Sequence, residues 1–205
     1  MKILEATPKN IKEASRVAKK GGLVVFPTET VYGLGCDPFN VDSVQRIIDI
    51  KGNRTKPFPI LASEMNAAQK IAVLSLNGKK LAKKFWPGPL TIIFPKKDTL
   101  PDLVTFNQKS VGLRIPDNIV AVKLIRLSGC LLIGSSANET GDMSPKNIDE
   151  ISEKLKENVD IVLDGGPTSQ GIPSTVVDLI SEKPKIIREG PISLIQLLKV
   201  LALSS

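Results

Sequence analysis

Apolar residues occur along the chain either in short continuous runs or at intervals of three or four. The runs predict buried strands at 23–26, 59–62, 90–94, 111–115, 131–133, 161–163, 175–179 and 185–187. The wider spacing predicts helices at 11–18, 44–50, 64–72, 77–85, 119–127, 148–157 and 192–203. Strands and helices alternate for most of the length, with two pairs of adjacent strands. This order predicts an α/β fold in which helices cover a twisted, mixed parallel and antiparallel sheet.

The stretch Gly22–Gly35 has the pattern of a ligand-binding loop. Its apolar run predicts a strand that ends at Pro27, because proline cannot donate a ladder hydrogen bond. Polar side chains follow at the carboxyl end of this strand, where open α/β sheets bind ligands: Thr28, Glu29, Thr30 and Tyr32. The alternative is a glycine-rich turn that carries surface threonines.

Composition predicts one soluble domain that spans residues 1–205. A content of 41% hydrophobic residues is enough for a sizeable core, and no repeat or long linker divides the chain. No apolar run approaches the about 20 residues of a membrane helix, and the N-terminus lacks the apolar segment of a secretory signal. Cys36 and Cys130 are the only cysteines. We therefore expect a cytoplasmic protein without membrane attachment.

Charge narrows the range of partners. The chain has 28 Lys and Arg against 21 Asp and Glu, a formal charge of +7. This excess favours anionic partners such as nucleotides, RNA or phosphorylated metabolites, although it also fits a plain solvated surface. The chain contains no histidine, which excludes Ser-His-Asp and Cys-His catalysis and histidine-ligated metals.

Three predicted strands lead into polar or cationic side chains, at Pro27–Gly35, at Gly134–Asn138, and at Arg114 with Pro116. A cavity that gathered them would combine hydroxyl, amide and guanidinium groups, which suits a polyphosphate. The candidates are Thr28, Thr30, Ser135, Ser136, Asn138, Lys51, Arg54, Lys56, Arg114 and Arg188. Arg114 lies within an apolar strand and therefore needs a partner.

Two further features bear on nucleotide binding. The chain has no GxxxxGK[ST] motif, and Pro38 follows Gly33 and Gly35 where a dinucleotide fingerprint needs glycine. A bound nucleotide would therefore be held in another way.

The segment 164–174, DGGPTSQGIPS, consists of turn-forming and small residues, and it is either a disordered connection or a mobile lid.

A set of motifs resembles one known family. They are PTETVYGLG from Pro27, Lys51, KPFPI from Lys56, WPGPLT from Trp86, Arg114 with Pro116, SSAN from Ser135, STVVD from Ser174 and REGPIS from Arg188. In this order, from about Leu23 to Ser193, the chain resembles the YrdC-type L-threonylcarbamoyladenylate synthases, in their short form without an extra C-terminal domain. The resemblance implies a single YrdC-like α/β domain with a deep, concave, basic cavity.

The resemblance also implies an activity. Such enzymes condense L-threonine, bicarbonate or CO2, and ATP into threonylcarbamoyl-AMP and pyrophosphate. A threonylcarbamoyl-transferase complex then uses the product to modify tRNA, and direct contact of this chain with RNA or tRNA stays open. Mg²⁺ would accompany ATP, held mostly by phosphates and water, because the sequence shows no dedicated carboxylate cluster.

Matched motif by motif, the resemblance assigns roles to residues of this chain. Lys51 and Arg54 would be catalytic and would contact the phosphates. The ATP-binding set is Lys51, Arg54, Ser110, Ser136, Asn138, Ser144 and Arg188, and the threonine-binding set is Thr30, Arg114, Ser174 and Thr175. The family spacing is Lys-x-Arg whereas this chain has Lys51-Gly-Asn-Arg54, so either Asn53 or Arg54 takes the place of the arginine.

Two alternatives remain. The first is a non-enzymatic RNA-binding or ribosome-assembly factor that uses the same basic concave face, which the small number of aromatic residues weakens. The second is a carbamoyl-adenylate-forming domain like those of hydrogenase maturation proteins. The chain lacks the zinc-finger and acylphosphatase segments that accompany such domains, which argues against it.

Overall fold

The protein, seen in a computed structural model that describes residues 1–181 and 183–202, contains two sheets. One has the order β1 (Lys2–Glu5), β9 (Ile161–Asp164), β2 (Val24–Phe26), β3 (Gly33–Gly35) and β8 (Ser135–Ser136). The other has the order β11 (Lys185–Arg188), β10 (Thr175–Asp178), β5 (Leu90–Pro95), β6 (Ser110–Arg114), β4 (Ile60–Ala62) and β7 (Leu131–Ile133). Both mix parallel and antiparallel pairs, which confirms the predicted class, although the strands divide between two sheets where the sequence predicts one.

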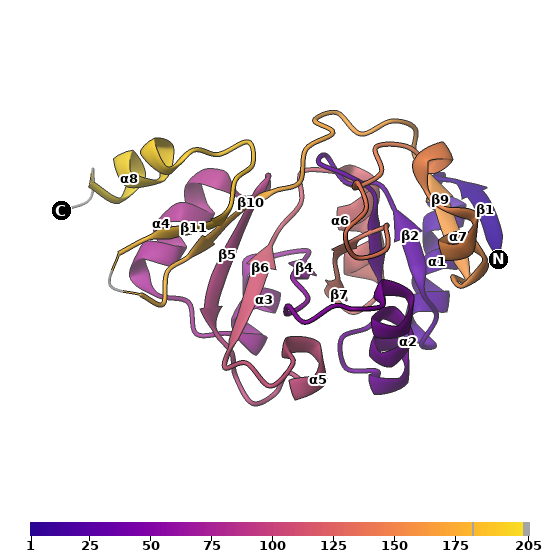
Figure 1. Cartoon of the computed structure of the whole chain (residues 1–205), viewed down its shortest axis with the longest axis horizontal. Helices are drawn as coiled ribbons and strands as arrows, with labels where there is room; N and C mark the ends of the chain where they lie inside the picture. The colour runs from indigo at the N-terminus through magenta and orange to yellow at the C-terminus, as the bar shows by residue number, and fades with distance from the viewer. Residues whose placement is uncertain (182, 203–205) are drawn as a thin grey trace.

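The helices pack around these sheets (Figure 1). They are α1 (Pro8–Lys19), α2 (Val41–Lys51), α3 (Met65–Ile71), α4 (Leu76–Phe85), α5 (Asp102–Thr105), α6 (Ile119–Leu127), α7 (Glu153–Glu157) and α8 (Leu194–Ala202). The side chains of Thr7 and Asn40 cap α1 and α2 by accepting backbone hydrogen bonds, as their residue types favour. Within the described ranges, no helix combines the length and the apolar composition needed to cross a membrane.

Some predicted boundaries shift. The predicted helix 148–157 divides into a 3-10 turn at Ile148–Glu150 and α7, because Ile151 adopts an extended conformation between them. The last predicted helix ends at Ala202, and its final residue, Leu203, lies outside the described residues. The short elements β1, β3, β8 and α5 are additional to those that the sequence predicts.

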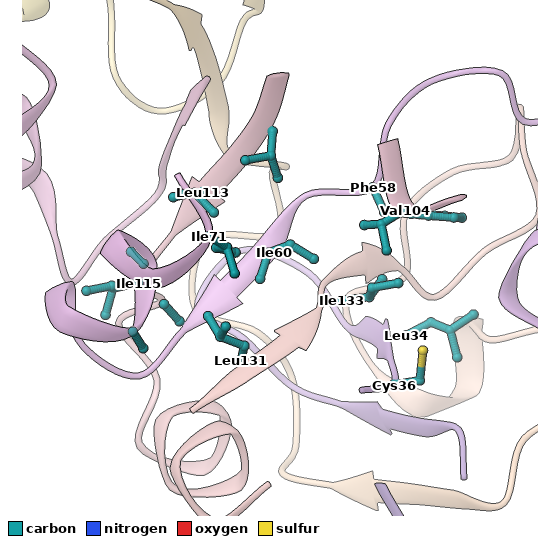
Figure 2. Close-up of a cluster of buried hydrophobic side chains, with 14 of the residues drawn as sticks. Leu34, Cys36, Phe58, Ile60, Ile71, Val104, Leu113, Ile115, Leu131 and Ile133 are labelled. Atoms are coloured by element: carbon teal, nitrogen blue, oxygen red, sulfur yellow. The ribbon is translucent and has the colours of Figure 1, made fainter. Parts of the chain in front are cut away.

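Residues of both sheets contribute to each of two hydrophobic clusters. Segment 131–136 belongs to the second sheet as β7 and to the first as β8, so it passes directly from one to the other. Figure 2 shows Leu34 of β3 and Cys36, just after this strand, near Ile133, together with Ile60 and Leu113 from the second sheet. At the crossing, a Cβ on Gly134 would lie 2.3 Å from Leu61 Cγ, so a larger residue would push the segments apart.

One face of the second sheet is packed and the other is more open. Val111, Leu113, Ile92 and Phe94 point to the buried face. Ser110, Gly112 and Arg114 alternate with them and share the opposite face of β6. This second face carries the polar groups that bear on function.

Candidate active site

A pocket of about 80 Å³ lies between the sheets, at the point where segments far apart in the sequence meet. Its lining consists of Thr30, Val31, Arg54, Pro59, Leu61, Thr91, Arg114, Gly134, Ser135, Ser136, Pro173, Ser174 and Arg188. Six of the residues that the sequence analysis assigned to ATP or threonine are among them: Thr30, Arg54, Arg114, Ser136, Ser174 and Arg188. The three arginines make this pocket suited to anionic ligands.

Arg114 forms a buried ion pair with Glu29. Its Nη2 lies 2.6 Å from Glu29 Oε2, and the two side chains are 7% and 5% exposed. Arg114 Nε also donates to Gly88 O at 3.1 Å. Burial lowers the pKa of the Arg114 guanidinium, and the charge of Glu29 acts in the opposite direction. The partner that a guanidinium inside a strand requires is therefore Glu29.

The neighbouring wall is a chain of polar contacts around Ser174. Arg188 Nη2 donates to Ser174 Oγ at 3.0 Å, and Arg188 Nε donates to Ser174 O at 3.0 Å. The hydroxyls of Ser174 and Thr91 lie 2.8 Å apart. Burial and the charge of Arg114 lower the pKa of Arg188. These contacts fix the Arg188 guanidinium beside the pocket.

Asn53 and Arg54, the two candidates for the arginine position of the Lys-x-Arg motif, lie in different surroundings. Arg54 lines the pocket, whereas Asn53 is exposed. Its guanidinium donates to Lys56 O and Pro57 O, both at 2.8 Å, and lies 4.5 Å from the centroid of the Phe58 ring. Burial and the charge of Arg188 lower its pKa to about 10, so it stays protonated at neutral pH.

Lys51, the last residue of α2, is tied to the loop 135–138. Its Nζ donates to Ser136 O at 2.8 Å, to Asn138 Oδ1 at 3.0 Å and to Asn138 O. Burial, followed by the charge of Arg54, lowers the Lys51 pKa to about 7, while Asp142 and Glu139 act in the opposite direction. Lys51 and Asn138 therefore contact Ser136, which lines the pocket, without lining it themselves.

Thr28 organises the loop that presents Thr30. Its hydroxyl donates to Val31 O at 2.7 Å, accepts from Val31 N at 3.2 Å, and lies 2.9 Å from Thr30 Oγ1. Threonine favours such local contacts with its own backbone, which compete with regular structure. The polar residues after Pro27 thus form a buried, ordered turn that lines the pocket, and the alternative of surface threonines is wrong.

The segment 164–174 joins β9 of one sheet to β10 of the other and is docked on this turn. Tyr32 Oη donates to Gly166 O at 2.8 Å and accepts from Gly165 N at 3.1 Å. Glu29 O accepts from Gln170 N at 2.9 Å and from Ser169 Oγ at 3.2 Å. The segment is therefore ordered, and its end, Pro173 and Ser174, forms part of the pocket.

Five assigned residues lie outside the lining: Lys51 and Asn138, described above, and Ser110, Ser144 and Thr175. Ser110 is at the opposite end of β6 from Arg114, on the same face of the sheet. Ser144 is half-buried beside Pro145, whose carbonyl oxygen accepts from Tyr32 N. Thr175 is fully buried, and its hydroxyl is engaged with the backbone of Ile192.

Glu29 and Thr91 contact assigned residues of the site but were not themselves assigned a role. Glu29 belongs to the PTET motif, and its signal was the need of Arg114 for a buried counter-charge. Thr91 ends the WPGPLT motif and pairs with Ser174. Neither contact follows from spacing, because each joins residues that are more than 80 positions apart in the chain.

A larger depression of about 230 Å³ lies elsewhere, between α2 and α7. Its charged lining residues include Arg46, Glu139 and Lys154. Arg46 pairs with Asp160, and Lys154 pairs with Glu139, so these charges are satisfied within the protein. None of the residues assigned to ATP or threonine lines it.

The site offers cations and hydroxyls rather than metal ligands. Across the described part of the chain, no group of three or more Asp, Glu, Cys or His side chains is placed to hold a metal ion. A divalent cation bound here would depend on oxygens of its ligand and on water.

Comparison with known proteins identifies relatives along most of the chain. The Sua5_yciO_yrdC family model, described as "Telomere recombination", matches residues 16–190. Threonylcarbamoyl-AMP synthase of Pyrococcus abyssi is 36% identical over 195 residues, which cover 93% of this chain and 57% of that protein. The chain thus spans little more than half the length of this curated relative.

Solved structures also resemble this chain along most of its length. The crystal structure of P. abyssi Sua5 complexed with L-threonine matches with a TM-score of 0.94 and 34% identity, over 98% of this chain and 61% of that one. Full-length HypF in its phosphate- and nucleotide-bound form matches with a TM-score of 0.78 but only 19% identity, over 88% of this chain and 29% of that one. The second likeness shows the fold alone.

Proposed function

Because the chain belongs to the Sua5/YciO/YrdC family, we propose that it is an L-threonylcarbamoyladenylate synthase. In this reaction L-threonine, bicarbonate or CO2, and ATP give threonylcarbamoyl-AMP and pyrophosphate. The observation that carries the proposal is the convergence of Arg54, Arg114 and Arg188 on one small pocket. The reaction joins a carboxylate-bearing amino acid to a triphosphate, and a site for it needs several fixed cations.

The threonine end of the site is formed by Arg114 with Thr30 and Ser174. A guanidinium can bind a carboxylate through two parallel hydrogen bonds, so we assign Arg114 to the carboxylate of threonine. Thr30 and Ser174 line the same pocket and supply hydroxyls to orient the substrate. P. abyssi Sua5, of similar fold, has been solved with L-threonine, which supports this assignment.

The ATP end is formed by Lys51, Arg54 and Arg188, with Ser136 and Asn138. Typical ligand pockets measure about 300–1,000 Å³, so the about 80 Å³ found here has room for a small polar group and not for a whole nucleotide. The remainder of ATP would extend along the more open face of β6, toward Ser110. Ser144 is the other residue that we expect on its path, and Thr175 acts indirectly by supporting the Ser174 strand end.

The chain acts mainly by holding reactants and stabilising negative charge. The neutral threonine amine attacks CO2 and releases a proton to solvent, which gives a carbamate. A carbamate oxygen then attacks the α-phosphorus of ATP, and the bond to the β-phosphate breaks to release pyrophosphate. Lys51 and Arg54 are the groups that we assign to the charge that develops on the phosphates. Mg²⁺ bound to ATP would neutralise further charge, and the phosphates and water would supply most of its ligands.

The proposed role in the cell follows from the product. Threonylcarbamoyl-AMP would pass to a transferase complex that modifies tRNA, in the cytoplasm. The alternative of a non-enzymatic RNA-binding factor is not favoured, because two relatives that are 36% identical carry the name of a synthase. Direct contact with tRNA remains a separate proposal.

The test is pyrophosphate release by the purified chain. We expect release from ATP with Mg²⁺ only when threonine and bicarbonate are both present, and a large loss of rate when either is omitted. An unchanged rate of pyrophosphate release when threonine or bicarbonate is omitted would indicate hydrolysis of ATP without condensation. No release, combined with salt-sensitive binding of tRNA, would favour the RNA-binding alternative.

A further inference from the structure

Helix α8 is apolar on almost all sides. Of the nine residues LIQLLKVLA, only Gln196 and Lys199 are polar, and helices of this composition are normally buried. Leu197 faces the core, yet Leu194, Ile195 and Leu198 are 40%, 66% and 45% exposed. Positions separated by three or four residues share one side of a helix, so these three form a continuous stripe.

The stripe lies at the same end of the molecule as an open sheet edge. Strand β11 is the last strand of its sheet, and no described strand pairs with its outer side. Ile186 of β11 and Leu197 of α8 pack on the same hydrophobic cluster, whereas Ile187, on the other face of the strand, is 51% exposed. Figure 1 shows α8 and β11 at the end of the molecule opposite the N-terminus. We call the α8 stripe and the outer edge of β11 the C-terminal surface.

The charge of this end is strongly positive. Helix α4, which packs on α8, and residues 175–202 together carry eight Lys or Arg against three Asp or Glu, a net charge of +5 out of the chain's +7. Lys185 and Lys199 form no ion pair with a described residue. A second copy of the chain would bring the same positive charge against this surface, so the charge opposes self-association.

We propose that the C-terminal surface docks an acidic protein segment that carries apolar side chains. The segment adds a strand to β11, as extended peptides do at open sheet edges, and covers Ile195 and Leu198 with its apolar side chains. Its carboxylates face the surrounding lysines.

Other anionic partners fit less well. RNA would neutralise the lysines but would leave the aliphatic stripe in contact with water. An anionic membrane would accept the stripe but offers no backbone groups to pair with the edge of β11, and α8 lacks the aromatic residues common in membrane-surface helices.

This surface lies beside the pocket. Arg188 is the last residue of β11 and also lines the pocket. A segment paired along β11 would therefore reach the rim of the site. The docking proposal itself rests on the surface alone and does not depend on the proposed reaction.

The docking proposal is tested by selecting peptides that bind the chain from a library of random sequence. A phage library of random 16-residue peptides is selected on the immobilised chain, and enriched peptides are synthesised and measured by fluorescence anisotropy. We expect peptides of net negative charge with aliphatic residues, whose affinity falls as salt is raised. The double variant Ile195→Ser/Leu198→Ser should weaken binding by about tenfold or more, since truncation of interface anchors commonly costs over 1 kcal/mol.

Ile119→Ser is the matched control, because Ile119 is 70% exposed on α6, away from this surface. It should bind the peptides as the wild type does, and all variants should keep the wild-type melting temperature. Enrichment of neutral or basic peptides, equal binding by the double variant, or no enrichment above an unrelated protein would overturn the proposal. Binding of the wild type, but not of the double variant, to vesicles that contain phosphatidylserine would also overturn it. So would a wild-type dimer in analytical sedimentation that the double variant does not form.

Discussion

Arg114 and Glu29 form the pair on which the site depends most at the scale of single residues. Arg114→Ala leaves the Glu29 carboxylate buried without its counter-charge, which commonly costs about 3–5 kcal/mol. We therefore expect a large fall in both stability and turnover. Thermal unfolding and pyrophosphate release, measured on the same samples, give the two effects.

A double variant separates the effect of Arg114 on stability from its effect on turnover. Glu29→Gln with Arg114→Met removes both charges, so stability should recover most of the loss, whereas threonine-dependent turnover should stay low because the carboxylate receptor is gone. If turnover recovered together with stability, Arg114 would have a purely structural role.

If ATP binds as proposed, the Lys51 ammonium should make its affinity dependent on pH. Its pKa in the free protein is about 7, and a bound polyphosphate stabilises the ammonium form, so the pKa is higher in the complex. Affinity should then be constant below this pH and fall by up to about tenfold per unit as pH rises above it. Calorimetry at about pH 8 in buffers of different ionisation enthalpy should show proton uptake on binding.

Lys51→Met is the control for this effect. It should bind ATP more weakly and lose both the proton uptake and the change in affinity above neutral pH. A wild-type affinity that does not change between about pH 7.5 and 9 would show that Lys51 does not meet the phosphates.

The sequence predicts the role of some of these residues but not the contacts of others. Arg114 could be predicted because a guanidinium inside an apolar strand needs a partner. Glu29 as that partner could not, since the contact joins residues 85 positions apart in the chain. The spacing also did not show that Asn53 is exposed whereas Arg54 lines the pocket.

At the scale of elements, the segment 164–174 depends on the hydroxyl of Tyr32. Tyr32→Phe keeps the buried ring and removes the contacts to Gly165 and Gly166, so docking should weaken by about 1 kcal/mol. We expect faster protease cleavage between Gly165 and Ser174 in the variant. ATP with threonine should slow cleavage in both proteins if the segment closes over ligands.

If segment 164–174 is a passive connection, ATP and threonine should leave its rate of protease cleavage unchanged. Cleavage rates that respond neither to Tyr32→Phe nor to ligands would contradict a lid. A site of cleavage in the loop 96–100, remote from this segment, provides the internal control.

The elements differ in how far their sequence reveals them. Helices α1 and α2 carry capping residues and clear apolar spacing, which is why their positions could be predicted. Strand β3 could not, because its glycines are typical of loops. Here they let the strand approach its neighbour, since a Cβ on Gly35 would lie 2.3 Å from Ile133 O.

At the scale of the whole molecule, the shared core predicts one cooperative unfolding transition. Chains of this length do not always unfold in one step, but residues of both sheets belong to one cluster around Ile133. Ile133→Ala should lower the free energy of unfolding by about 2–5 kcal/mol and move the single calorimetric peak without splitting it. Ile119→Ala, at an exposed position, should leave the peak in place, and two separate peaks in the wild type would contradict a single domain.

The division into two sheets could not be predicted from the alternating pattern. The pattern places strands along the chain but does not say which strands are neighbours, and β9 pairs with β2 across more than 130 residues. The pocket lies where these distant pairings bring the loops together. For this reason sequence patterns alone identified candidate residues but not their geometry.

The most direct test of the central claim is the mass of the product. The chain, ATP, Mg²⁺, L-threonine and [¹³C]bicarbonate are incubated briefly, and adenylates are analysed by mass spectrometry. We predict an adenylate that contains threonine and a single ¹³C atom from bicarbonate, formed by the wild type and strongly reduced in Lys51→Met. An adenylate without the label, or AMP as the sole product, would contradict the proposal that this pocket joins threonine, bicarbonate and ATP.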